Sequence, residues 1–294
     1  MVRVLLLLIA SAVLVALPVT DSQTILHAER SSAGDLEVSG ELAGAPAGTT
    51  RYVRYEDLLR MRQETFTVDD DSNLPAHSEI SGVSLAELTH LLGIASADTL
   101  VAAICDDQYH ANYPHEYVET HHPLLVLRIN GKPHDQWPAL KEVGNPGPYL
   151  ISHPFFKPSF KVLSHEDEPQ IPYGVVRLEF RRESAVYGAI KPPGNWPLDS
   201  PVEQGYEIAR QDCFRCHNMG AEGGTKAGVS WLKLASVAAL SPQKFGQIIH
   251  EPTSVNAKAT MPAHADYDGA TLNALTIYFR TFSKPGSDKL GSDQ

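Results

Sequence analysis

Cysteine is scarce in this sequence, which has only three cysteines in 294 residues. An exported domain that is held together by disulfide bonds usually has an even number of cysteines. Two of the three lie close together, at Cys213 and Cys216, which leaves Cys105 without a partner. We therefore expect the fold to rest on a hydrophobic core and not on disulfides, and the chain is long enough for two domains.

Long apolar runs are also missing, with one exception at the N-terminus. There, one early cation, Arg3, is followed by about 14 apolar residues from Val4 to Leu17. This length is typical of a signal peptide and is short for a membrane span. We predict that residues 1–22 are a signal peptide and that the protein is exported to the periplasm. No clean A-x-A cleavage site precedes Val19, so an uncleaved membrane anchor remains the alternative.

Positive charge is in short supply, because 24 Lys and Arg stand against 35 Asp and Glu, a formal net charge of −11. Residues 196–294 carry 9 basic and 10 acidic side chains, so a net charge of −10 falls on residues 1–195. An acidic surface does not neutralise phosphates, which excludes nucleic acid as a partner. The excess serves solubility, and it would also steer a basic partner surface toward the N-terminal half.

Residues 24–182 have the patterns of an α+β domain with a mainly antiparallel sheet. One helix is predicted over "VSLAELTHLLG", where Ser84 is the N-cap, Glu87 follows three residues later and Gly93 ends the helix. The Asn130-Gly131 pair predicts a tight hairpin turn. Alternating or wholly apolar residues predict strands in "LEVSGEL", "TFTVDD", "TLVAAIC", "PLLVLRI" and "YGVVRLEFRR".

A proline-rich segment, residues 183–198, predicts a stiff extended linker between two domains. Residues 199–283 have the patterns of an all-α domain. Ser200 is a candidate N-cap followed by Pro201, and "SPQKFGQIIHEP" repeats this arrangement from Ser241. The last predicted helix places Leu272, Leu275 and Phe279 on one face, and residues 284–294 form a polar tail.

The segment "RQDCFRCHNMG" contains a C-x-x-C-H motif formed by Cys213, Cys216 and His217. Two thiols about one helical turn apart are placed to bond the two vinyl groups along one edge of a porphyrin, and the adjacent imidazole is placed to bind the iron. A zinc site would need two further ligands, and the sequence has no second C-x-x-C. The motif therefore predicts one covalently attached haem c.

A second ligand to the iron is expected downstream, in "NAKATMPAHADYDG". Met261 lies there about 45 residues after Cys216, in a polar loop before the last helix. A thioether is a soft ligand that favours Fe(II) and raises the reduction potential. We predict Met261 as the second ligand, with His250 and His264 as the competing candidates.

With these motifs, residues 199–283 resemble a class I cytochrome c. The resemblance covers the C-x-x-C-H segment, the glycine-rich "EGGTKAGVSWL", the "MPAH" loop and the closing helix. It implies covalent haem, electron transfer and no substrate chemistry at an iron whose two axial positions are filled. It also implies a close crossing of the first and last helices at Gly205 and Tyr278. The family commonly has proline after the glycine that corresponds to Gly228; here Val229 follows, and its carbonyl can accept the same bond from His217.

Residues 50–180 resemble the molybdopterin-binding fold of the sulfite oxidase family, through "SGVSLAELTHLLGI", "CDDQYHANYP" and "LLVLRINGKPHDQW". In that family the metal-binding cysteine precedes the helix that corresponds to "SGVSLAELTHLLGI". This chain has no cysteine in that part of the sequence. The family's basic residues around the pterin are missing as well, and a cofactor phosphate would require such groups. We therefore expect the fold without molybdopterin, and Cys105 as a small buried side chain at the end of a strand.

Four histidines lie within a short stretch, at His110, His115, His121 and His122. Such a cluster is compatible with a metal site. If His121 and His122 lie on one strand, however, their side chains point to opposite faces, so surface histidines are the preferred interpretation.

The sequence favours an exported monohaem cytochrome c that carries single electrons between redox partners, with an N-terminal docking or scaffold domain. The alternative is a molybdopterin-dependent oxidoreductase of the sulfite dehydrogenase type that passes electrons to the haem. A third hypothesis is a metal-binding or sensing module at the histidine cluster.

Overall fold

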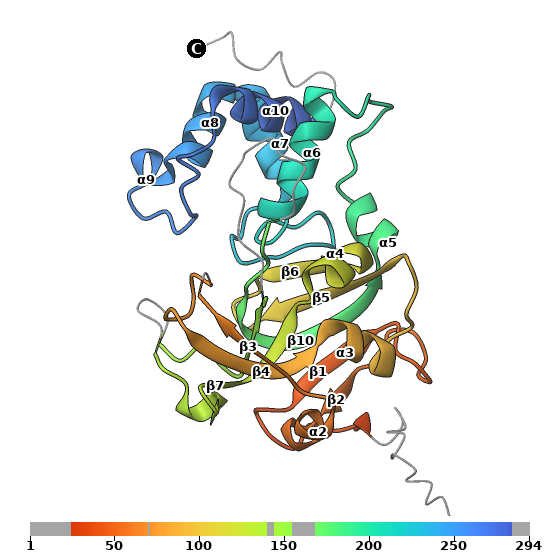
Figure 1. Cartoon of the computed structure of the whole chain (residues 1–294). Coiled ribbons are helices and arrows are strands. Elements are labelled where there is room, and N and C mark those ends of the chain that lie inside the picture. Colours follow the sequence, from red (N-terminus) through yellow and green to blue (C-terminus); the bar gives the residue numbers. More distant parts are fainter. Residues whose placement is uncertain (1–24, 70, 140–143, 155–167, 284–294) are drawn as a thin grey trace, which may run out of the picture.

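The computed structural model describes residues 25–69, 71–139, 144–154 and 168–283, as a sheet region followed by a helical region (Figure 1). The predicted segments 1–22 and 284–294 lie outside the described residues. Among the described residues, no helix combines the length and the apolar character that crossing a membrane requires.

The sheet region contains ten strands and a few short helices in the described residues. Its strands are β1 (Leu36–Gly40), β2 (Arg51–Val53), β3 (Glu64–Val68), β4 (Ser78–Ser84), β5 (Thr99–Cys105), β6 (His110–Pro114), β7 (Leu124–Ile129), β8 (Lys132–Pro133), β9 (Tyr149–Ser152) and β10 (Tyr173–Arg182). Its helices are α2 (Tyr55–Arg60), α3 (Leu85–Leu92), α4 (His115–His121), the 3-10 helix η1 (His134–Gln136) and α5 (Glu183–Gly188).

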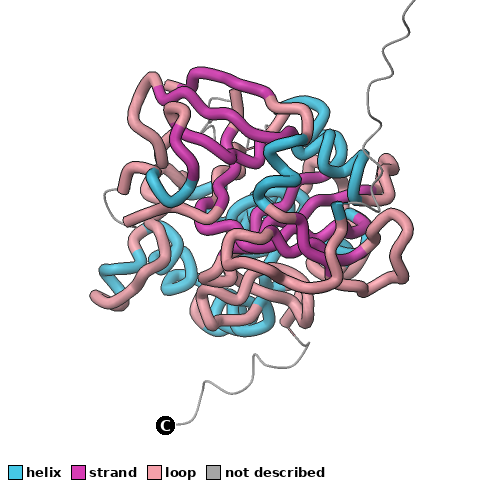
Figure 2. Tube along the Cα trace, turned by 90° about the horizontal axis from the view of Figure 1, so that it is seen from below, coloured by secondary structure: helices cyan, strands magenta, loops and turns pink. Residues whose placement is uncertain are grey.

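The strands form one mixed sheet in the order β2-β1-β10-β9-β7-β4-β3, with β5 and β6 branching from β10 and β8 pairing with β7. Only the pairing of β1 with β10 is parallel among the described strands. This agrees with the predicted α+β domain and its mainly antiparallel sheet. The strands run across the molecule with helices on opposite sides of them (Figure 2).

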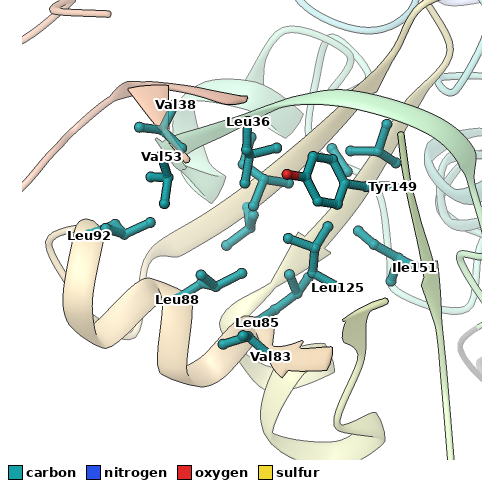
Figure 3. Close-up of a cluster of buried hydrophobic side chains, with 14 of the residues drawn as sticks. Leu36, Val38, Val53, Val83, Leu85, Leu88, Leu92, Leu125, Tyr149 and Ile151 are labelled. Carbon is teal, nitrogen blue, oxygen red and sulfur yellow. The ribbon is translucent and has the colours of Figure 1, made fainter. Parts of the chain in front are cut away.

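Helix α3 covers one face of the sheet. The Ser84 side chain accepts a hydrogen bond from the backbone N–H of Glu87, and the helix ends at Gly93, as predicted. Leu85, Leu88 and Leu92 of α3 point toward the sheet, where they share a core with Leu125, Tyr149 and Ile151 (Figure 3). These side chains are buried, and they form the main core of the sheet region.

The helical region consists of α6 (Pro201–Asp212), α7 (Trp231–Leu240), α8 (Pro242–His250), α9 (Pro252–Val255) and α10 (Gly269–Arg280). Ser200 caps α6 through the backbone N–H of Glu203, as predicted. The same prediction for Ser241 was wrong, because α8 begins with Pro242 but the Ser241 side chain makes no capping bond. The crossing of α6 and α10 is close, since a Cβ atom at Gly205 would collide with the backbone of Ala274 and with Tyr278.

The connection between the two regions differs from the predicted extended linker. Its first part is α5, and Val186, Tyr187 and Ile190 are buried in the core of the helical region. Its second part, from Pro193 to Asp199, is exposed throughout. The apolar residues of this segment bind it to the helices, an effect that its proline content did not indicate.

Strand β5 joins the two regions. Its residues are all buried, and alternate side chains belong to different cores. Val101, Ala103 and Cys105 lie in the core of the sheet region, whereas Leu100 and Ala102 lie in the core of the helical region. The strand is apolar throughout because both of its faces are covered. The two regions therefore pack directly against each other, with β5, β6 and α4 closest to the helices (Figure 1).

Candidate functional site

The C-x-x-C-H segment forms the turn that follows α6. The backbone N–H of Cys216 and that of His217 both donate to the carbonyl oxygen of Cys213, at 3.1 and 3.0 Å. This turn brings both cysteines and the histidine together. Both cysteines have free thiols, and burial raises the pKa of each thiol.

His217 is held in one orientation by Val229. The Nδ1 atom of the ring lies 2.7 Å from the carbonyl oxygen of Val229, so Nδ1 is the donor and Nε2 keeps its lone pair. Burial lowers the pKa of His217, against the smaller effect of this hydrogen bond, which favours the neutral ring that binds metals. The backbone bond expected at Val229 is therefore present without the family's proline.

A cavity of about 590 Å³ lies between the two regions and is lined by Cys213, Cys216, His217 and Met261. The structure thus brings the four predicted site residues to one space, whose volume is in the range of cofactor sites. Of the competing ligands, His264 also lines this cavity. His250 does not; it lines a surface groove between α8 and α10.

The wall of the cavity that faces the helices comes from the sheet region. It contains both polar and apolar side chains, namely Asp71, Ser72, Tyr109, Ser152, His153, Glu168, Pro169 and Ile171. These residues were not predicted from the sequence, because no spacing pattern links them to a motif that lies far along the chain.

Backbone hydrogen bonds fasten this wall to the C-x-x-C-H turn. The N–H of His110 donates to the carbonyl of Arg215 at 2.9 Å, and the N–H of Thr225 donates to the carbonyl of Gln108 at 3.1 Å. A Cβ atom at Gly224 would collide with the Arg215 carbonyl, so only glycine allows this approach. The Lys226 ammonium and the Asp107 carboxylate add an ion pair at 2.6 Å.

Charged groups also meet at the cavity. The Arg215 guanidinium lies 3.5 Å from Glu168 of the sheet region and 3.8 Å from Asp212 of α6. The Tyr267 hydroxyl donates to Asp212 at 2.6 Å. Arg215 lies inside the C-x-x-C-H motif, so its position beside the two cysteines follows from the sequence. No motif places Glu168 there.

Cys105 is 2% exposed in the core of the sheet region, and it is not among the residues that line the cavity. Burial raises the pKa of its thiol. This position agrees with the expectation of a small buried side chain.

The four histidines do not converge. His115 begins α4, His121 ends it and His122 is its left-handed C-cap, so the assumption that the last two share a strand was wrong. No group of three or more His, Cys, Asp or Glu side chains in the described residues is arranged to hold a metal ion.

Comparisons with known proteins give a partial likeness. No family model matches the sequence, and no curated protein matches it at a significant level. Among solved structures, the sulfane dehydrogenase SoxCD from Paracoccus pantotrophus matches at 19% identity with a TM-score of 0.36. The match covers 52% of this chain and 40% of that chain. A likeness of this extent does not by itself assign a fold or an activity.

Proposed function

We propose that this protein is an exported c-type cytochrome that carries single electrons between redox partners. One haem would be attached through thioether bonds to Cys213 and Cys216. The observation that carries the proposal is the shared cavity, which is lined by both thiols, by His217 and by Met261. The donor set fits the group, because it combines two closely spaced thiols, an oriented imidazole and a thioether.

A bound haem would supply one-electron exchange between Fe(III) and Fe(II). The residues of this chain would bind the haem and set its reduction potential. The Val229 carbonyl fixes the His217 ring so that Nε2 is free for the iron. The Met261 thioether would be the second protein ligand to the iron and would favour Fe(II). With His217 and Met261 both bound, no substrate would bind at the iron.

The sheet region would serve as a scaffold that closes the cavity. The backbone hydrogen bonds of His110 with Arg215 and of Gln108 with Thr225 support this role. They hold the sheet region in one position against the segment that contains the C-x-x-C-H motif. No observation favours a molybdopterin function. The one cysteine of the sheet region is enclosed in its core, and its pKa is raised, so it is not suited to be a thiolate ligand.

The test is the optical spectrum of the protein purified from a host that exports it and matures c-type cytochromes. We expect a sharp reduced α-band, and the colour should stay with the protein after extraction with acidified acetone because the thioether bonds are covalent. A missing α-band, or haem that is extracted, would refute the covalent attachment. The N-terminal sequence of the same preparation decides between a cleaved signal peptide and a retained anchor.

A further inference from the structure

Two carboxyl groups, one from each region, meet at the wall of the cavity. Glu168 precedes β10, and Asp212 is the last residue of α6. Both carboxyl groups lie beside the same nitrogen of Arg215, at 3.5 and 3.8 Å, and both line the cavity together with Cys213, Cys216 and His217. Two ionised carboxylates at one guanidinium group repel each other, so a proton on one of the two is favoured.

The surroundings decide which group holds the proton. Asp212 is fixed through its side chain, which accepts a hydrogen bond from the Tyr267 hydroxyl at 2.6 Å. Glu168 is fixed through its backbone, since its N–H donates to the Gln211 side chain at 2.7 Å and its carbonyl accepts from Tyr117. Burial is the largest cause that raises the pKa of Glu168, so the proton lies on Glu168. With the single cation Arg215, the cluster is neutral with this proton and carries one negative charge without it.

We propose that the Glu168–Asp212 pair binds one proton when the adjacent haem site gains one electron from an external one-electron donor, and releases it when the electron leaves. The inference rests on the proposed function. An added electron makes the cavity more negative, and the neutral form of the cluster is then favoured. The balance is one electron from the donor and one proton from solvent, with no bond broken in the protein. The protein would thus carry a proton together with its electron.

The acidity of the pair is suited to this exchange. Burial is the largest cause, followed by the charge of Asp212 and the hydrogen bond to it, and together they raise the pKa of Glu168 to about 8 although Arg215 lowers it. A carboxyl group with an ordinary pKa would be fully ionised at neutral pH in both redox states. The raised pKa keeps the proton exchangeable in the neutral to alkaline range.

Other titratable groups around the pair do not compete. Burial lowers the pKa of His264, and it lowers that of His153 to about 3, so both rings are neutral. Burial raises the pKa of Tyr109 and of Tyr267, so both hydroxyls keep their protons. Arg215 stays charged. Asp71 and Asp266 also line the cavity, and they are the remaining acids that variants should address.

The experiment is a redox titration of the full-length protein at pH values from about 6 to about 10, around the pKa of Glu168. The reduced state holds the proton more tightly, so the midpoint potential should fall as the pH rises. The limiting slope is about 59 mV per pH unit, a tenfold change in proton concentration for one electron. Glu168→Gln should remove this slope. Asp212→Asn should move it to lower pH, because the substitution removes the charge and the bond that raise the pKa of Glu168.

The matched control is Glu183→Gln. Burial raises the pKa of Glu183 as well, but this side chain lies beside Arg210 at 3.9 Å and does not line the cavity. It should keep the slope of the wild-type protein, and so should Asp71→Asn and Asp266→Asn. A slope that persists in Glu168→Gln, or that is lost in Asp71→Asn or Asp266→Asn, would overturn the assignment.

Failure of the inference is distinguishable from failure of the proposed function. The reduced α-band is recorded before every titration, so a protein without haem contradicts the proposed function alone. A protein with haem whose potential does not change with pH contradicts only the proton coupling. If Glu168→Gln does not fold, the wild-type protein still decides: a pH indicator in weakly buffered solution should report proton uptake on reduction, and no uptake would refute the proposal.

Discussion

The helical region and the sheet region differ in how they contribute to the site. In the helical region, Cys213, Cys216 and His217 are neighbours in sequence, and a single turn brings them together. In the sheet region, the residues that face the cavity come from loops and from the end of β9, which are far apart along the chain. Chemistry that is encoded locally is therefore visible in the sequence, whereas the environment of that chemistry is made by long-range packing.

The largest effect should separate the cysteines of the two regions. Cys213→Ser or Cys216→Ser each removes one thioether bond, and the double variant should lose all covalent haem. Cys105→Ser should keep the haem, because its side chain lies in the other core. The measurement is haem retained after denaturing electrophoresis. Loss of haem in Cys105→Ser with the fold intact would contradict the assignment of the haem to the cysteines of the helical region alone.

A second test concerns the two candidate ligands in one loop. Met261→Ala should lower the midpoint potential strongly, because a thioether favours Fe(II) and its loss stabilises Fe(III). His264→Ala should leave the potential close to that of the wild-type protein. Redox titration of both variants at one pH measures the difference. The reverse order of effects would assign the iron to His264.

The packing of β5 predicts that the regions are coupled. Leu100 belongs to a strand of the sheet but is fully buried in the core of the helices. Leu100→Ala should lower the free energy of unfolding by about 2–5 kcal/mol. Ile94→Ala, at a residue that is 55% exposed, should have almost no effect. Chemical denaturation followed by fluorescence measures both variants, and a Leu100→Ala protein as stable as the control would argue against a shared core.

The smallest effect distinguishes two helical glycines. Gly205→Ala would place a methyl group against the backbone of Ala274, and we expect a loss of about 1–3 kcal/mol in stability. Gly246→Ala in α8 has nothing within 4 Å, so the better helix former should stabilise the protein by about 0.5–1 kcal/mol. Thermal unfolding of the two variants should shift in opposite directions. Equal shifts would mean that the crossing at Gly205 is looser than described.

Much of the fold was predictable from local patterns, and the exceptions have physical reasons. The caps at Ser84 and Ser200 were predicted because a hydroxyl and the backbone N–H three residues later form a short-range bond. Ser241 is also followed by proline, yet its backbone angles (φ −148°, ψ 67°) differ from those of Ser200 (φ −72°, ψ 150°), and it makes no capping bond. The segment 183–198 contains a buried helix because Val186 and Tyr187 find a partner surface that no local pattern reveals.

The candidate site divides in the same way. The thiols, His217 and Met261 were predictable because ligand chemistry restricts the residue types and the spacing. Glu168 was not, since a glutamate has no special spacing and its partner Asp212 lies on another element. The apolar sequence of β5 was the one local sign that both faces of this strand are covered. A strand with one exposed face would alternate between apolar and polar residues.

The most direct test of the central claim is elemental analysis of the intact, purified protein for iron, molybdenum, copper and zinc. We expect about one iron per chain, held as covalent haem, and one electron taken up per chain in a reductive titration. A protein without iron would refute the haem site in the helical region. About one molybdenum per chain that disappears in Cys105→Ser would move the chemistry to the sheet region.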